Sequence, residues 1–279
     1  MKKHLIVILS LLVCFQLCYS QETYVQKGEF GITAGLSHYF GDLNPTGKID
    51  HPHQVFGVYY RKQFTNYTAL RIAGHYALLG YSDKYNSNQF MNRRNLSFNT
   101  DIFEFTVQGD FNFFRFNPNE EDENFTPYLT FGAGVFSFDP YAFYHGQKVY
   151  LRPLHTEGQG SYQGRKEYST TAFCFPLGMG LKYCLSKKIN LSFEVTHRFT
   201  NTDYIDDVST TYIGASRFPS NSDGTASLAK ILQDRSTETG SPIGTEGKQR
   251  GWSKQKDQYL FAEFGLSLNL TEYACPPSR

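Results

Sequence analysis

The chain has 279 residues, a formal net charge of +1 and 19% charged residues. Such a balance, with no basic stripe, gives no reason to expect a nucleic-acid partner. A mean hydropathy of −0.45 argues against helical membrane spans, and after the N-terminal segment no apolar run approaches the roughly 18 residues that a spanning helix needs. Aromatic residues are abundant, at 16% of the chain, and the length suits one β-domain.

The first twenty residues have the pattern of an export signal. Lys2 and Lys3 are followed by the apolar stretch Leu5–Leu17, and small residues at Cys18 and Ser20 precede Gln21. We predict a signal peptide over residues 1–20 and an outer-membrane barrel domain over residues 21–279. A retained membrane anchor is the alternative for the first segment.

Three cysteines remain after Gln21: Cys174, Cys184 and Cys275. An odd number does not make a disulfide framework. One bond between Cys184 and Cys275 stays possible, because both could lie at the same rim of a barrel. No Cys/His spacing suggests zinc.

Eight stretches alternate apolar and polar residues with period 2, which predicts strands with one face of each kind. In the fourth stretch, for example, Phe103, Phe105 and Val107 alternate with Glu104 and Thr106. Most stretches are close to the 9–11 residues of a tilted spanning strand. The eight are Glu29–Tyr39, Val55–Lys62, Tyr67–Leu79, Asp101–Phe114, Thr126–Phe138, Thr171–Cys184, Ile189–Phe199 and Gln258–Leu270.

The links between these stretches alternate in length. The shorter set is Gln63–Asn66, Arg115–Phe125 and Leu185–Lys188, and the longer set is Phe40–Gln54, Gly80–Ser97, Asp139–Ser169 and Thr200–Asp257. Alternating short and long links are typical of an up-and-down barrel inserted from the periplasm. We therefore predict an all-β, eight-stranded antiparallel transmembrane β-barrel with long extracellular loops, in the outer membrane, with both termini periplasmic.

A soluble barrel would have the same period with its faces reversed. Three features favour lipid outside. The apolar face of the central stretches carries no charge, and the polar face is sparse and small, as at Gly31, Thr33 and Gly35. Aromatic residues also gather near strand ends, as at membrane interfaces. These are Tyr39, Phe40, Tyr59, Tyr60, Phe113, Phe114, Tyr183 and Tyr259.

The charges of the polar face should then lie in the lumen and nearly neutralise one another. A one-residue slip would expose several of them to lipid, so the pattern sets the register. We interpret them as a paired network that fills a narrow barrel; a transport path is the alternative. The network consists of Arg71, Glu104, Asp110, Lys182, Glu194, Arg198 and Glu263, with Glu29 and Arg61 on the same face.

Motifs for catalysis are weak. No phosphate-binding loop or G-x-S-x-G elbow occurs. His197, Thr200 and Asp203 faintly resemble the outer-membrane lipid A deacylases, but no serine lies in the expected place. We predict that the protein is not an enzyme, has no cofactor and takes no small-molecule substrate, and we keep lipid A modification as the less favoured alternative.

Two acidic clusters are candidate sites. Asp203, Asp206 and Asp207 are weak Ca²⁺ candidates, because hard cations prefer several carboxylate oxygens, but the calcium-loop spacing is missing. The stretch Asn117–Phe125 predicts an acidic periplasmic turn. One interpretation of this stretch is a solvated turn. The alternative is a docking point for a periplasmic partner, formed by Asn117, Glu120, Glu121 and Asp122.

The long links are too aromatic for plain disorder. In the last of them, Leu228, Ile231 and Leu232 have helical spacing after Ser222 or Asp223, either of which could cap a helix. We expect a short amphipathic helix packed on the barrel mouth.

Five segments in order resemble one known family. They are GLSHYFGDLNP (35–45), FDPYAFYHGQKVYLRPLHTEGQG (138–160), TNTDYIDDVSTTY (200–212), QRGWSKQKDQYLF (249–261) and ACPP (274–277). Together they look like the PorG-like outer-membrane barrels of the type IX secretion system. The TEGQG and DYIDDVS stretches contribute most to the resemblance.

The resemblance implies a non-catalytic accessory component of the secretion and gliding machinery, placed in the outer membrane of a Gram-negative cell. It also implies association with the periplasmic ring lipoprotein and its partner subunits, beside the lipid bilayer itself. It brings no binding residues to this chain. The alternative is a free-standing small barrel whose outer loops bind ligands or surfaces.

Overall fold

Eight long strands pair antiparallel in a ring in the computed structural model, which describes residues 28–162 and 164–270. The predicted signal peptide, Cys275 and the ACPP segment lie outside the described residues. Along the ring the strands follow the order β3-β2-β1-β10-β9-β8-β5-β4, and β3 also pairs with β4. This last pairing closes the sheet, so the predicted eight-stranded up-and-down barrel is confirmed.

The described helices and strands have the following bounds: β1 Gly28–Phe40, β2 His53–Gln63, β3 Thr68–Ser82, η1 Asp83–Tyr85, α2 Gln89–Arg94, β4 Ser97–Asn112, η2 Glu121–Glu123, β5 Phe125–Ser137, β6 Tyr141–Tyr144, β7 Gln147–Tyr150, η3 Arg152–Leu154, β8 Thr171–Ser186, β9 Ile189–Thr200, η4 Ala215–Arg217, α3 Leu228–Gln233, η5 Arg235–Glu238 and β10 Gln258–Leu270.

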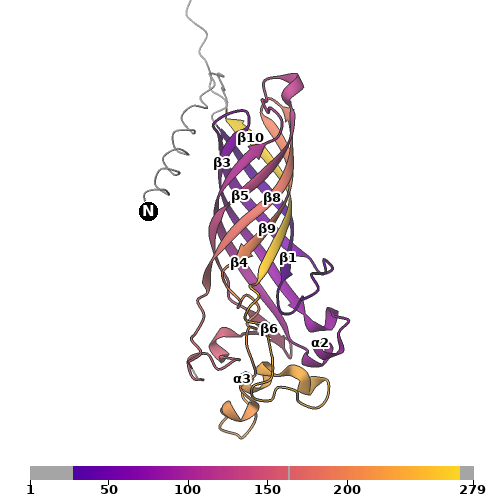
Figure 1. The fold of residues 1–279 in the computed structure, drawn as a ribbon, viewed down its shortest axis with the longest axis vertical. Helices are drawn as coiled ribbons and strands as arrows, with labels where there is room; N and C mark the ends of the chain where they lie inside the picture. The colour runs from indigo at the N-terminus through magenta and orange to yellow at the C-terminus, as the bar shows by residue number, and fades with distance from the viewer. Residues whose placement is uncertain (1–27, 163, 271–279) are drawn as a thin grey trace, which may run out of the picture.

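Links of different kinds gather at the two ends of the barrel. Figure 1 shows α2, α3 and the β6–β7 hairpin together at one end, here called the long-loop end, and we call the opposite end the short-turn end. The alternation is less clean than predicted. Because β2 begins at His53 and β4 ends at Asn112, the links 41–52 and 113–124 are equally long.

The eight predicted strands all exist, but several are longer than predicted at the long-loop end. β3 and β4 continue as a paired ribbon to Ser82 and Ser97, beyond the length that a bilayer requires. Sequence reasoning missed the β6–β7 hairpin and α2, because each lies in a long link and has no periodic stretch long enough to predict an element.

The outward face of the strands is a belt of exposed apolar side chains. Phe103 is 60% exposed, Phe264 70% and Met179 67%, values that a water-soluble barrel would not tolerate over its whole circumference. The inward face carries the charges and is buried. Apolar side chains outside and polar ones inside are the arrangement of an outer-membrane-type barrel, so the belt lies in lipid. In the part of the chain that is described, no helix is long and apolar enough to cross a membrane.

The predicted location at the membrane interface is wrong for three of the aromatic residues near strand ends. Tyr39, Tyr59 and Tyr259 are buried and point into the barrel, since they share the parity of the charged residues on their strands. Phe40 is half-buried on the outward face, and Phe113, Phe114 and Tyr183 are exposed.

The main apolar core lies at the long-loop end, inside the barrel mouth and under the loops. Val55, Leu79 and Ile102 continue the inward face of their strands from the charged region towards the long-loop end, and Phe98 lies beside them. Loop residues such as Ile205 join the same cluster. The loops therefore share one hydrophobic core with the strand ends.

The helix α3 forms in the predicted place but begins with a different cap. Its N-cap is Ser227, whose hydroxyl accepts a hydrogen bond from the Lys230 N–H, rather than Ser222 or Asp223. Leu232 is buried in the core cluster, whereas Leu228 is 42% exposed. The helix is thus anchored to the mouth through its last turn.

If the belt faces lipid, a charge in its middle should be costly. We predict that Phe105→Arg lowers the free energy of unfolding by about 2–4 kcal/mol, the cost of a cation at mid-bilayer. Phe143→Arg, at an equally exposed phenylalanine of the β6–β7 hairpin, should change it little. Urea unfolding in lipid vesicles would measure both, and equal effects would contradict the assigned membrane position.

Candidate functional site

The barrel lumen holds all the charged residues of the inward face. Each is at most 7% exposed. Four are basic and five are acidic, and His75 lies among them. The nine are Glu29, Arg61, Arg71, Glu104, Asp110, Lys182, Glu194, Arg198 and Glu263.

Near the short-turn end, Arg61 is the centre of the network. Its guanidinium pairs with Glu29 and donates to Asp110 at 2.6 Å, and Lys182 lies 3.7 Å from Glu29. The Lys182 ammonium also lies 4.4 Å from the ring of Phe116, a buried residue of the 113–124 link. Phe116 thus packs against the charged network at its short-turn end.

In the middle of the barrel, Arg71 links two sides of the ring. Its guanidinium lies 2.8 Å from Glu194 on β9 and 3.6 Å from Asp110 on β4. Glu194 also accepts a hydrogen bond from the Tyr128 hydroxyl at 2.7 Å. The charges in this layer are therefore paired across the lumen as well as along the sheet.

Towards the long-loop end, Glu104 collects the next set of contacts. Arg198 lies 3.3 Å from it, His75 lies 3.2 Å from it, and the Tyr259 hydroxyl donates to it at 2.7 Å. His75 also lies 3.6 Å from Glu263, which accepts a hydrogen bond from the Thr33 hydroxyl at 2.6 Å.

Strand register alone would place like charges side by side. Glu263 is directly opposite Glu194, and Arg61 is directly opposite Arg71, which is an unfavourable arrangement on one face of a sheet. Partners on other strands resolve both conflicts. Arg61 contacts Glu29 on the neighbouring β1 and Asp110 on β4, Arg71 contacts Glu194 across the lumen, and Glu263 contacts His75 on β3. A buried charge left without such a partner would be strongly destabilising.

Sequence reasoning missed several lumen residues. His75 and Tyr59 share the parity of the charged residues on their strands, and Tyr128 shares that of the buried Thr126 and Thr130 on β5, so the period-2 pattern could have identified all three. Gly31 and Gly180 make room for the two tyrosine rings, since a Cβ at either position would overlap the ring. Phe116 lies in a link, and no sequence signal places its ring in the lumen.

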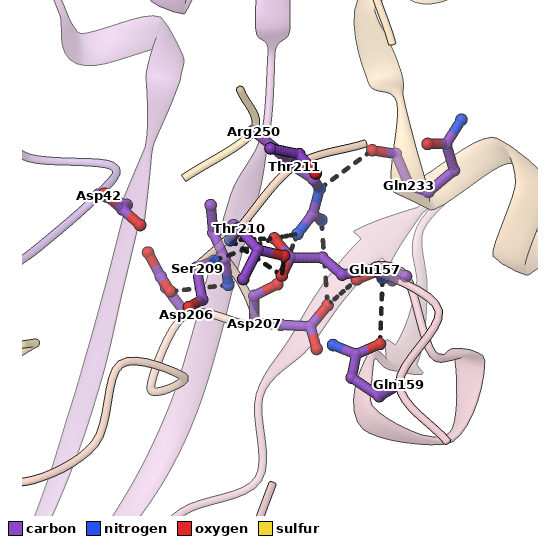
Figure 2. Close-up of polar contacts among 12 residues, drawn as sticks. Asp42, Glu157, Gln159, Asp206, Asp207, Ser209, Thr210, Thr211, Gln233 and Arg250 are labelled. Atoms are coloured by element: carbon purple, nitrogen blue, oxygen red, sulfur yellow. Dashed lines mark hydrogen bonds and ion pairs between the residues drawn. The ribbon is translucent and has the colours of Figure 1, made fainter. Parts of the chain in front are cut away.

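Beyond the lumen, at the long-loop end, the long loops interlock through a second buried network, here called the loop cap. Figure 2 shows Glu157 at its centre, together with Asp42, Asp207, Ser209, Thr210 and Arg250. The Glu157 carboxylate is fully buried and accepts hydrogen bonds from the backbone N–H groups of Ser209 and Thr210 at 3.0 Å. Arg250 completes it at 3.1 Å.

The same arginine holds Asp207 as well. Arg250 donates to the Asp207 backbone carbonyl at 2.6 Å, while the Asp207 side chain accepts from Thr156 and from Tyr168. On the other side, Arg94 pairs with Asp83 at 2.7 Å and donates to the Arg250 carbonyl at 2.5 Å. Two buried arginines thus fasten the loops after β3, β5 and β9.

These contacts join the segments that carried the family resemblance. Glu157 belongs to TEGQG, Asp207 to DYIDDVS and Arg250 to the QRGW stretch, and Asp42 of the first segment accepts the Trp252 N–H at 2.9 Å. The four described motifs therefore form one folding unit, and loop packing explains their spacing.

The aspartates of the cap have raised pKa values, because burial opposes their charge. Desolvation raises the pKa of Asp203 to about 7, against a hydrogen bond from Ser209. Burial raises the pKa of Asp207 to about 6, against Arg250. Burial and neighbouring carboxylates raise the pKa values of Asp206 and Asp257 well above 3.8. Both side chains accept a hydrogen bond from the Tyr39 hydroxyl.

The three calcium candidates do not converge. Asp203 accepts from Ser209, Asp206 from Tyr39, and Asp207 from Thr156, so their oxygens are turned towards different donors. Within residues 28–162 and 164–270, no group of three or more His, Cys, Asp or Glu side chains is arranged to hold a metal ion. The hydrogen bonds that these carboxylates accept agree with the alternative of a hydrogen-bonded loop turn.

The three enzyme candidates are likewise apart. His197 lies on the outward face beside Phe40 and Phe199 and shares a 2.6 Å hydrogen bond with Gln258. Thr200 is buried and donates to the Asp257 carbonyl, and Asp203 faces Ser209. No contact between described atoms brings the three into one catalytic arrangement.

The predicted acidic docking turn lies at the short-turn end. Asn117 organises it by accepting the Asn119 N–H at 3.1 Å, and Arg115 pairs with Glu123 at 2.9 Å. Glu120, Glu121 and Asp122 remain exposed. Cys184, also at this end, is buried and its thiol donates to the Ser186 carbonyl.

The sequence matches, over residues 4–214, the family described as a domain of unknown function, DUF6089. Among curated proteins, none matches. Similar solved structures include Neisserial surface protein A, with 9% identity, a TM-score of 0.41 and coverage of 88% of this chain and 97% of that one. Another is Ail, the attachment invasion locus protein of Yersinia pestis, with 12% identity, a TM-score of 0.40 and coverage of 88% and 99%. OprG from Pseudomonas aeruginosa has 9% identity, a TM-score of 0.35 and coverage of 89% and 99%.

The lumen network predicts a strong and partner-specific effect. Glu104→Ala should lower the free energy of unfolding by roughly 3–5 kcal/mol, because it leaves Arg198 buried without its carboxylate. Adding Arg198→Met should recover part of the loss, since no unpaired charge then remains. Denaturant unfolding in lipid would measure both. A double variant with a lower free energy of unfolding than Glu104→Ala would contradict the pairing.

The loop cap should be more stable in acid than in base. A folded-state pKa of about 7 at Asp203, above the unfolded 3.8, means that the folded cap binds the extra proton. Its stability is therefore greatest below pH 4 and falls as the pH rises towards 7. Hydrogen exchange of loop amides, corrected for intrinsic rates and referred to the strands, should show more protection at pH 5 than at pH 8.

Two variants separate this effect from a general one. Asp203→Asn should reduce the pH dependence, because it removes the titrating group while keeping an acceptor for Ser209. Asp223→Asn, at an aspartate of the same end that is fully exposed, should leave it unchanged. Protection that rises with pH would contradict the assignment.

Proposed function

Because this chain belongs to the DUF6089 family, a domain of unknown function, its role has to be argued from its own features, and we propose that it is a non-catalytic accessory component of the type IX secretion and gliding machinery. In this proposal it is an outer-membrane barrel that docks to the periplasmic ring lipoprotein and its partner subunits. The long-loop end faces the outside of the cell, and the short-turn end faces the periplasm.

The filled lumen is the observation that favours a structural role. Arg61, Lys182 and Arg198 are buried in it with their carboxylate partners, and the buried ring of Phe116 packs against Lys182. An eight-stranded barrel has an interior just wide enough for side chains. A barrel filled in this way suits anchoring better than conduction.

The acidic turn is the feature we assign to docking. Glu120, Glu121 and Asp122 project from η2 and its cap, and their carboxylates accept no hydrogen bond from the described residues. The sequence resemblance to the PorG-like barrels supplies the identity of the partner. A basic surface on a ring subunit would complement three exposed carboxylates.

Co-purification from native membranes tests the proposal. The tagged barrel should bring down the periplasmic ring subunits, and the triple variant Glu120→Gln, Glu121→Gln, Asp122→Asn should bring down much less of them. Raising the salt concentration should reduce the amount of bound subunits more steeply for the wild type than for the triple variant. The matched control neutralises three exposed carboxylates of the long loops, Glu167, Asp223 and Glu246, and should retain the subunits.

Absence of ring subunits from the wild-type sample would contradict the proposal. Unimpaired secretion of cargo in a deletion strain would do so independently. Equal loss in both triple variants would leave the machine in place but assign the docking surface elsewhere than to the acidic turn.

The second candidate is a free-standing barrel whose outer loops bind ligands or surfaces. The observation that favours it is the loop cap, because the cost of ordering four long loops around Glu157 and Arg250 is easier to understand if they present a fixed surface. Binding of whole cells or matrix by the wild type, with no ring subunits in the pull-down, would support this candidate instead.

A further inference from the structure

A groove opens beside the barrel rim where the β4–β5 ladder is interrupted. The two strands pair up to Phe103 and Ser137, and the chain then leaves the ladder until Tyr141 of β6 meets Asn99 of β4. On the β8 side of β5, the Phe138 N–H donates to the Thr170 carbonyl at 2.9 Å, and across the gap the Asp139 N–H donates to the Thr100 hydroxyl at 3.0 Å. The resulting groove has a volume of about 310 Å³.

The lining of the groove mixes carboxylates, hydroxyls and aromatic rings. Asp101 and Asp139 supply two carboxylates, Ser137 and Thr170 two hydroxyls, and Phe103 and Tyr150 two exposed rings. Carboxylates accept hydrogen bonds and hydroxyls both donate and accept them. Such a set favours a ligand with several hydroxyl or ammonium donors and an apolar face for the rings.

The charges of the lining argue against a phosphate. Two cations lie near the lining, and each already has a carboxylate partner. The Lys148 ammonium lies 3.5 Å from Asp101 and 3.6 Å from the centre of the Tyr141 ring. The Arg152 guanidinium, which acts more strongly on Asp139 than Lys148 does, lies 3.4 Å from Glu167. Asp101 also accepts the Tyr76 hydroxyl at 2.8 Å, whereas the Asp139 carboxylate accepts no hydrogen bond from the described residues. Asp139 is thus an exposed acceptor that is ready for a ligand donor.

The position of the groove points to an amphiphile. Phe103, 60% exposed, lines the groove and is also the top of the lipid-facing column that continues with Phe105 on β4. Aromatic side chains at this level mark the boundary between acyl chains and headgroups. A molecule with its chain on Phe105 would have its headgroup in the groove.

We propose that this groove binds the hydroxyl-rich saccharide headgroup of a lipid in the leaflet at the long-loop end. Asp139 and Asp101 accept hydrogen bonds from the sugar hydroxyls, the Tyr150 ring covers the C–H face of the sugar, and Phe103 and Phe105 contact the acyl chain. This site is separate from the docking turn, so it does not depend on the proposed function.

Amide NMR of the full barrel in lipid nanodiscs tests the proposal with three probes. Dodecyl maltoside should shift the amide resonances of Ser137, Tyr150 and Thr170 in a saturable way, and dodecylphosphocholine, which has the same chain, should not. Maltose alone should need a concentration at least about tenfold higher, since it lacks the contact of the chain with the belt.

Point variants connect the response to the lining. Tyr150→Ala and Asp139→Asn should each weaken the apparent affinity for dodecyl maltoside by about tenfold, as expected for one charge-assisted hydrogen bond or one aromatic contact. Phe143→Ala is the matched control, because Phe143 is exposed on the same hairpin but does not line the groove. Asp139→Asn is nearly isosteric and exposed, so it keeps the test valid if Tyr150→Ala shifts the hairpin.

Three outcomes would overturn the proposal. Equal shifts with both dodecyl probes would mean chain contact without headgroup recognition, an adventitious additive only. Maltose binding as tightly as dodecyl maltoside would retain the saccharide but overturn the lipid as its source. A response to dodecyl maltoside that is unchanged in both variants would place the binding outside the groove.

Discussion

The pairing of charges inside the lumen is the constraint on which the rest of this barrel depends. Lipid surrounds the belt, so a slip of register would turn residues such as Arg71 and Glu104 towards acyl chains. Inside, the same residues are stable only because partners reach them from across the ring, as Arg71 reaches Glu194. The closed sheet satisfies the backbone, and the ionic network satisfies the interior.

A change of chemistry along the barrel axis divides the molecule into regions with different tasks. The charged layers fill the interior of the membrane-spanning part. At the long-loop end the interior is filled by an apolar cluster that includes Val55, Phe98 and Phe261. This cluster gives the loops something to pack on. The loop cap then adds buried polar contacts around Glu157 and Arg250, which make the loop arrangement specific.

The motifs that suggest a family turn out to be the residues that hold the loops together. TEGQG, DYIDDVS and QRGW meet at Glu157, Asp207 and Arg250, far apart in the chain but adjacent in space (Figure 2). Their role in folding explains why they need particular residues at particular spacings. The two surfaces that we propose for recognition, the acidic turn and the rim groove, are separate from these motifs.

The sequence by itself determined the strands, their faces and the set of lumen charges, because period 2 is a local property that each strand carries in its own residues. Only the tertiary structure decided which charges pair, because Glu263 and Glu194 are neighbours on the sheet yet have different partners. Phe116, the β6–β7 hairpin and the groove beside Phe103 also depended on it. Phe116 and the groove arise from contacts between segments distant in the chain, for which a periodic pattern contains no signal. The hairpin is local, but its two strands of four residues are too short to show a period.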